Sequence, residues 1–167
     1  MRKLVVTSVS LCAAVLATKA VAQAPPAPAP APPPAYGETV NLEQAKKAAA
    51  AAQDFAAKNG WAMAITVVGP SGDLVYFQKM DNTQFASIAI AQHKARAAAT
   101  FRRPTKVFED RIATPAGVPA LTLDGVIASE GGIPLVMGGK LVGALGCSGG
   151  TGQQDGQTCQ AGVDAMK

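Results

Sequence analysis

The sequence predicts an α+β domain in which an antiparallel sheet is flanked by helices. Segments 42–58 and 84–101 carry the signals of helices, while 61–80 and 133–147 have the alternation and turn residues of hairpins. These elements follow one another as helix, strand pair, helix, short helix, strand pair and helix. With 167 residues, of which 49% are hydrophobic and 16% charged, the chain has enough apolar content for one compact domain.

Residues 1–22 are predicted to be a secretory signal peptide. Two basic residues precede an apolar run over residues 4–17, and Ala20-Val21-Ala22 offers the small residues that a signal peptidase requires. A membrane anchor fits less well, because a helix needs about 20 apolar residues to span hydrocarbon. We therefore expect a periplasmic or secreted protein with no membrane attachment after cleavage.

Residues 23–38 are predicted to be a Pro/Ala-rich linker, and residues 39–167 the folded domain. Proline fixes φ and removes amide donors, so the linker should form an extended polyproline II spacer. A ligand for an aromatic proline-binding groove is the alternative. The leader holds three of the 15 basic residues, which leaves 12 against 11 acidic ones. This near-neutral balance gives nucleic-acid binding no support.

The first helix is expected over residues 42–58. The side chain of Asn41 is placed to cap its first turn while Gln44 reaches back, and an Asn-Gly pair after residue 58 is a typical helix end. A short helix is expected from Thr105 to about residue 112. A C-terminal helix is expected over residues 155–166.

Two hairpins supply the strands. Residues 61–68 alternate with period two and have apolar side chains on both faces, which indicates a buried strand, and the turn at 69–73 leads into its partner over 74–80. In the second hairpin, strands 133–137 and 140–147 flank a two-residue Gly-Gly turn in which both residues tolerate positive φ.

The helix at 84–101, which Pro104 ends, has small side chains on two sides. This pattern would allow a flat ligand to approach the helix closely. One stripe comprises Phe85, Ile88, Gln92, Ala95 and Ala99, and the other comprises Ala86, Ile90, His93, Ala97 and Thr100.

His93 is the single histidine, which excludes sites with several histidine ligands. It is either an axial haem ligand or an ordinary surface or core histidine. Six basic residues surround it in the sequence. They would either grip propionates or another carboxylate, or form a solvated helix face. They are Lys94, Arg96, Arg102, Arg103, Lys106 and Arg111.

The glycine-rich loop 148–155 is a candidate anion site, because its backbone N–H groups are free to converge and a helix follows. A tight strand-to-helix connection is the alternative. Neither a dinucleotide fingerprint nor a P-loop is present. The candidate anion-binding residues are Ser148, Gly149, Gly150, Thr151 and Gly152.

Cys147 and Cys159 are the only cysteines after the leader. In an oxidising compartment they form either a disulfide or two buried free thiols.

The chain over residues 42–167 resembles the GlcG/HbpS-like haem-binding or haem-degrading family, which is related to the C-terminal domains of PduO-type proteins. The segments that carry the resemblance are AKKA at 45–48, VVGPSGDLV at 67–75, KARAAATFRRPT at 94–105, GGIPL at 131–135 and VGALGCSGGTGQQD at 142–155. Cys147 departs from the family, which usually has an aliphatic residue there.

The resemblance implies a profilin-like fold, assembly into homo-oligomers and haem as cofactor, in degradation, storage or sensing. Threonine and histidine both serve as iron ligands among relatives, which leaves Thr105, Thr100 and His93 as candidates. The alternatives are an enzyme or accessory protein that binds a small, glycolate-like carboxylate, and a non-catalytic oligomeric partner. The expected cofactor-binding residues are His93, Thr100, Arg102, Arg103, Thr105 and Lys106, with His93 as the metal ligand.

Overall fold

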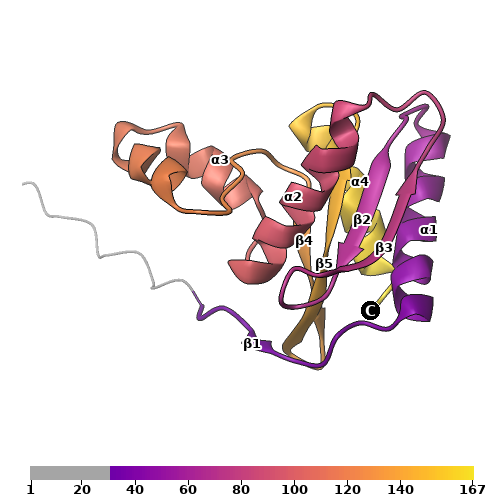
Figure 1. The fold of residues 1–167 in the computed structure, drawn as a ribbon, viewed down its shortest axis with the longest axis horizontal. Coiled ribbons are helices and arrows are strands. Elements are labelled where there is room, and N and C mark those ends of the chain that lie inside the picture. The colour runs from indigo at the N-terminus through magenta and orange to yellow at the C-terminus, as the bar shows by residue number, and fades with distance from the viewer. Residues whose placement is uncertain (1–30) are drawn as a thin grey trace, which may run out of the picture. The chain divides into compact units, whose positions relative to one another are not determined.

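The elements form a sheet with helices on both faces (Figure 1). The computed structural model describes residues 31–167, so the predicted signal peptide and most of the predicted linker lie outside the described residues. The elements are β1 (Ala35–Tyr36), α1 (Leu42–Lys58), β2 (Ala64–Val68), β3 (Leu74–Lys79), α2 (Ala86–Thr100), α3 (Lys106–Ile112), a short 3-10 helix η1 (Pro115–Thr122), β4 (Gly132–Met137), β5 (Lys140–Ser148) and α4 (Gly152–Asp164). None of the helices in the described part of the chain has the length and apolar content needed to cross a membrane.

Strand β5 organises the sheet. It pairs antiparallel with β2 and β4, and β2 pairs antiparallel with β3, which confirms both predicted hairpins. Gly138 and Gly139 join β4 to β5 at φ values of 56° and 75°, as the two-residue turn requires.

The sheet is mixed rather than purely antiparallel. Ala35 and Tyr36, which the sequence analysis placed in the linker, pair parallel with Lys140 and Leu141 of β5. Two residues behind a proline run carry no strand signal of their own. They gain a partner only because β2 pairs with residues 144–148 of β5 and leaves Lys140 and Leu141 open on that side. The end of the expected spacer is therefore part of the folded unit.

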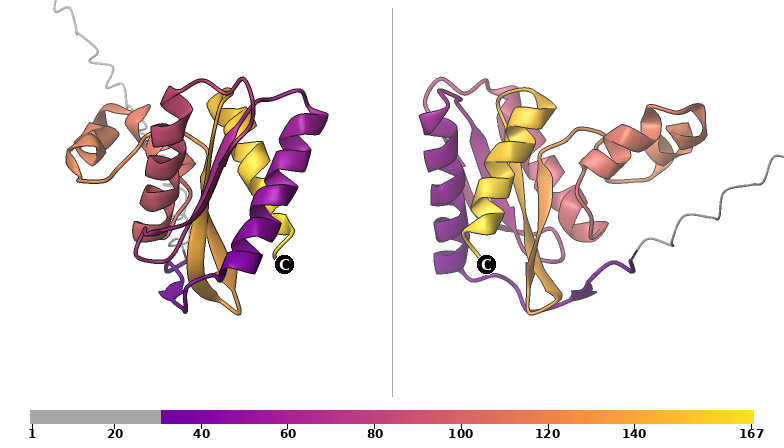
Figure 2. Two further views of the ribbon diagram at one scale, coloured as in Figure 1. Left: turned by 45° about the vertical axis from the view of Figure 1, so that its right-hand side comes forward. Right: turned by 180° about the vertical axis from the view of Figure 1, so that it is seen from behind.

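Helix α2 covers one face of the sheet, and α1 with α4 covers the other (Figure 2). On the α1 side the core holds Ile65 and Leu145, packed against the alanines of α1. On the α2 side Val68 and Ala144 meet alanines of that helix. Alanine side chains allow both helices to approach the strands closely.

Helices α1 and α4 each begin with a capping box. Asn41 and Gln44 form the predicted box at α1. Helix α4, in contrast, begins at Gly152, three residues before the predicted start, because Thr151 and Gln154 form a second box. The Thr-x-x-Gln pattern of residues 151–154 is the sequence signal that was missed.

The structure contains a disulfide between Cys147 of β5 and Cys159 of α4, both fully buried. It decides between the two interpretations left open by the sequence. The bridge ties a strand to the helix that follows it, across a separation of 12 residues.

Reduction of this disulfide is expected to lower the free energy of unfolding by about 3 kcal/mol, because the bridge removes loop-closure entropy from the unfolded chain. Urea unfolding with and without a thiol reductant measures the difference. A variant with both cysteines replaced by alanine serves as the control and should not respond to the reductant. An equal response of both proteins would contradict the bridge.

Candidate functional site

The outer face of α2, opposite the sheet, carries His93. The side chain is half-buried, and no hydrogen bond joins its imidazole to another of residues 31–167. Ala86 and Ala89, two turns and one turn before His93 on the same face, are exposed, whereas Ala97, one turn after it, is fully buried. The imidazole therefore has small exposed side chains on its N-terminal side.

The inner face of α2 offers no room for a flat ligand. Ala95 and Ala99 of the first predicted stripe are fully buried, and Ala95 packs on Val68 and Ala144 of the sheet. The helix lies so close that a Cβ on Gly146 would come within 2.0 Å of the Ala91 carbonyl oxygen. In the second stripe Ala86 and Thr100 are exposed and His93 is half-buried, while Ala97 is fully buried.

The six basic residues predicted to lie around His93 do not act as one cluster, because several of them bind different partners. Lys94 is buried and bound to Asp155, so its expected role in a surface cluster is wrong. Arg102 donates to the Pro34 carbonyl at 3.3 Å and lies 5.1 Å from the centre of the Tyr36 ring. Lys106 pairs with Asp110, one turn further along α3. Three guanidinium groups of this set, Arg96, Arg103 and Arg111, are exposed.

The two threonine candidates differ in availability. Thr105 is fully buried, donates to the Ser129 carbonyl at 2.6 Å and accepts from the Gly132 amide at 2.9 Å. Since its hydroxyl both donates and accepts a hydrogen bond within the protein, Thr105 is not available as an iron ligand in this structure. Thr100 is exposed and donates to the Arg96 carbonyl within its own helix at 2.9 Å.

The glycine-rich loop already holds an anion of the chain itself. The Gly150 amide donates to the Asp155 carboxylate and the Thr151 amide to the Gln154 side chain, each at 2.9 Å. These two amides are therefore not available to an external anion in this structure. At the start of the loop, Ser148 is buried against the Ser87 hydroxyl at 3.1 Å. The remaining predicted residues, Gly149 and Gly152, provide the tight connection.

The Asp155 carboxylate also binds the Lys94 ammonium, at 2.7 Å, and both side chains are buried. Burial raises the pKa of the Asp155 carboxyl, while Lys94 and the Gly150 amide lower it to a smaller extent. Gly131 makes room for the pair, because a Cβ there would lie 3.0 Å from the Lys94 Nζ. The sequence did not signal this pair, since its partners are 61 residues apart.

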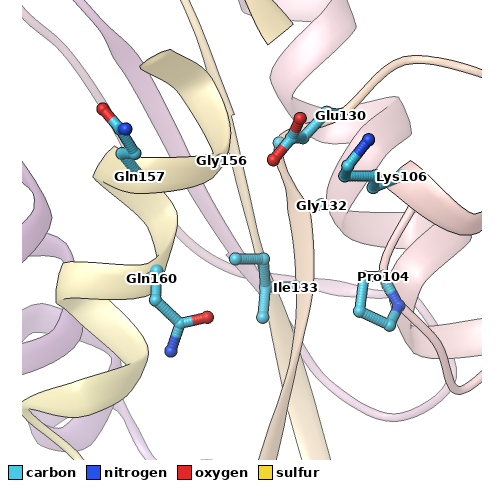
Figure 3. A pocket seen from close by; sticks show the side chains of 9 residues that line it. Pro104, Lys106, Glu130, Gly132, Ile133, Gly156, Gln157 and Gln160 are labelled. Atoms are coloured by element: carbon cyan, nitrogen blue, oxygen red, sulfur yellow. The ribbon is translucent and has the colours of Figure 1, made fainter. Parts of the chain in front are cut away.

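A cavity of about 300 Å³ lies where β4 begins, between α4 and the start of α3 (Figure 3). Burial raises the pKa of the Glu130 carboxyl at its upper end, and Lys106 lowers it less. Apart from Lys106, the sequence analysis named none of its residues as functional. The lining residues are Pro104, Lys106, Glu130, Gly131, Gly132, Ile133, Gly156, Gln157 and Gln160.

A site built from several strong metal ligands is absent from residues 31–167, where no three His, Cys, Asp or Glu side chains gather around one point. A haem iron needs only one or two axial ligands from the protein, so the single imidazole of His93 fits that chemistry.

Comparison with known proteins gives a consistent result. Residues 40–164 match the model of a family described as haem degrading protein HbpS-like. The GlcG protein of Escherichia coli K12 is 38% identical over 110 residues, which cover 65% of this chain and 81% of that protein.

Two solved structures have the same fold. A double mutant of Streptomyces reticuli HbpS has a TM-score of 0.72 and 29% identity, and the match covers 84% of this chain and 99% of that one. A PduOC complex with haem has a TM-score of 0.69 and 23% identity, and the match covers 76% and 94%. At that identity the second comparison shows the fold alone.

Proposed function

Because the chain belongs to the HbpS-like family of haem-degrading proteins, we propose that it is an exported haem-binding protein whose iron ligand is His93. The observation that carries the proposal is the position of this imidazole, half-buried on the outer face of α2 and without a partner among residues 31–167. Bound haem would supply a redox-active iron and a flat apolar ring.

The residues around His93 fit such a ligand. An imidazole offers a nitrogen lone pair to iron, and the exposed Ala86 and Ala89 add little bulk beside it. Exposed Arg96 and Arg103 carry the positive charge that propionates pair with. Thr100, two turns beyond His93, is the second candidate ligand.

Two further features support parts of the proposal that concern location and assembly. The Cys147–Cys159 disulfide favours the periplasm or the exterior, where disulfides persist. Exposed apolar side chains on residues 107–123, a segment that includes most of α3 and all of η1 and projects beyond α2 in Figure 1, favour a homo-oligomer. These side chains are Val107, Val118, Leu121 and Leu123.

The alternative ligand, a small carboxylate such as glycolate, has less support. The N–H groups of Gly150 and Thr151 are already bound within the chain. The cavity at β4 presents the carboxylate of Glu130, which would repel an acid.

Replacing His93 by alanine is expected to weaken hemin binding about tenfold or more and to shift the Soret band, because an iron–nitrogen bond is lost. Titration of the purified protein with hemin, followed by absorption spectroscopy, measures both effects. Gln92→Ala is the matched control, since Gln92 is the neighbouring side chain and bonds only to its own helix.

The Soret position and affinity of Gln92→Ala should equal those of the wild type. Should His93→Ala also retain them, His93 is not the ligand, and Thr100→Ala then tests the second candidate. Failure of the wild type to bind hemin at micromolar concentration would contradict the proposed function as a whole.

A further inference from the structure

We propose that the cavity at the start of β4 binds a small organic cation, an ammonium or guanidinium group on a short apolar chain, with Glu130 as its counter-ion. This site is separate from the outer face of α2 and does not depend on haem. It rests on the shape of the cavity, on its charge and on the hydrogen-bonding groups left available in it.

The cavity has an apolar base and one acidic end. Ile133 and the backbone of Gly131 and Gly132 form its base, and Pro104 stands on one side (Figure 3). Its volume of about 300 Å³ suits a small ligand. The short apolar chain of an amine would lie on Ile133 while its charged end meets Glu130.

The position of Glu130 depends on a glycine in the opposite helix. A Cβ on Gly156 would come within 2.3 Å of the Glu130 Oε1, so only a bare backbone at this position of α4 leaves room for the carboxylate. On the other side, the Glu130 amide donates to the Glu109 carboxylate at 2.6 Å. The backbone of Glu130 is thus fixed beside the cavity, and its carboxyl group lies against Gly156.

The local charge favours a cation. The Glu130 carboxylate accepts no hydrogen bond from residues 31–167, and Glu109 and Asp110 add negative charge nearby. The nearest cation, the Lys106 ammonium, is bound to Asp110 at 2.7 Å. A cationic ligand would offset the burial that raises the pKa of the Glu130 carboxyl.

On the α4 side of the cavity, the Gln160 side chain lies at the end away from Glu130 (Figure 3). The Gln160 amide nitrogen already donates to the Asp164 carboxylate at 2.9 Å. Its carbonyl oxygen has no partner among residues 31–167 and can accept a hydrogen bond, while its second N–H can donate one. The choice of a cation therefore rests on Glu130, whose carboxylate pairs with an ammonium or guanidinium group and repels a carboxylate.

The test is a titration of ¹⁵N-labelled protein with n-butylammonium chloride, followed by NMR in the absence of hemin. The expected result is a saturable shift of amides in residues 131–133 and 156–160. 1-Butanol, which has the same chain without the charge, should cause little shift. Glu130→Gln should weaken butylammonium binding at least tenfold, whereas Glu43→Gln, an exposed acid in α1, should not change it.

Lowering the pH gives a second test on the unaltered protein. Below the raised pKa of Glu130 its carboxyl is protonated, so butylammonium affinity should fall as the pH drops through that value. No saturable shift, an equal response to 1-butanol, unchanged affinity in Glu130→Gln, or affinity that does not fall with pH would each overturn the proposal. None of these outcomes bears on hemin binding by His93.

Discussion

Asp155→Asn is expected to lower the free energy of unfolding by about 3–5 kcal/mol, because it leaves the Lys94 ammonium buried without its counter-charge. The two side chains are 2.7 Å apart and almost completely inaccessible to solvent. The variant loses stability because the Lys94 ammonium stays buried without a partner, and not because the attraction between the two side chains is strong. Desolvation of Asp155 outweighs the groups that favour its ionised form, so the intact pair adds little net stability.

Urea denaturation of the variant measures this loss. Asp164→Asn is the matched control, since Asp164 pairs with Lys167 at the exposed end of α4, and it should leave the midpoint unchanged. Replacing both partners with apolar residues, Lys94→Met together with Asp155→Leu, should recover most of the loss, because no buried charge remains. A double variant as unstable as Asp155→Asn would contradict this explanation.

Gly146→Ala is expected to cost about 3 kcal/mol or more, a large part of a typical total stability of about 5–15 kcal/mol. The added methyl group would lie 2.0 Å from the Ala91 carbonyl oxygen and 2.5 Å from the Ala95 amide nitrogen. Both are helix backbone atoms, so relief requires α2 as a whole to move away from β5.

Circular dichroism during urea or thermal unfolding measures the effect. Gly152→Ala, at the first position of α4, is the control, because its nearest new contact would be 3.3 Å away at the end of the flexible Glu109 side chain. This control should change the stability by no more than about 0.5 kcal/mol. Equal stability of the two variants would mean that α2 does not pack as closely on β5 as the structure shows.

The Gly146 contact also explains why the proposed haem surface lies on the outside of α2. A helix pressed this closely against β5 leaves no slot on its inner side, so the alanines there serve packing alone. Of the alanines near His93, Ala86 and Ala89 are exposed and Ala97 is buried. Sequence periodicity identified both stripes without indicating which one meets the sheet.

Local signals predicted most of the elements. The Asn41–Gln44 capping box, the Gly-Gly turn at 138–139 and the period-two pattern at 61–68 each depend on neighbouring residues, and the structure confirms all three features. The start of α4 was missed although the Thr151–Gln154 box is equally local. The glycines of this loop indicated an anion site, and the capping box that begins the helix was not recognised.

The sequence by itself determined the α+β fold class, the two hairpins, the family resemblance and His93 as the single histidine. Only the tertiary structure decided that Lys94 is buried with Asp155, that Thr105 is already hydrogen-bonded, and that Glu130 faces a cavity with Gln160. The physical reason is distance along the chain. Helix and turn signals act over a few residues, whereas burial and ion pairing join residues far apart in sequence, such as Lys94 and Asp155, which are 61 residues apart.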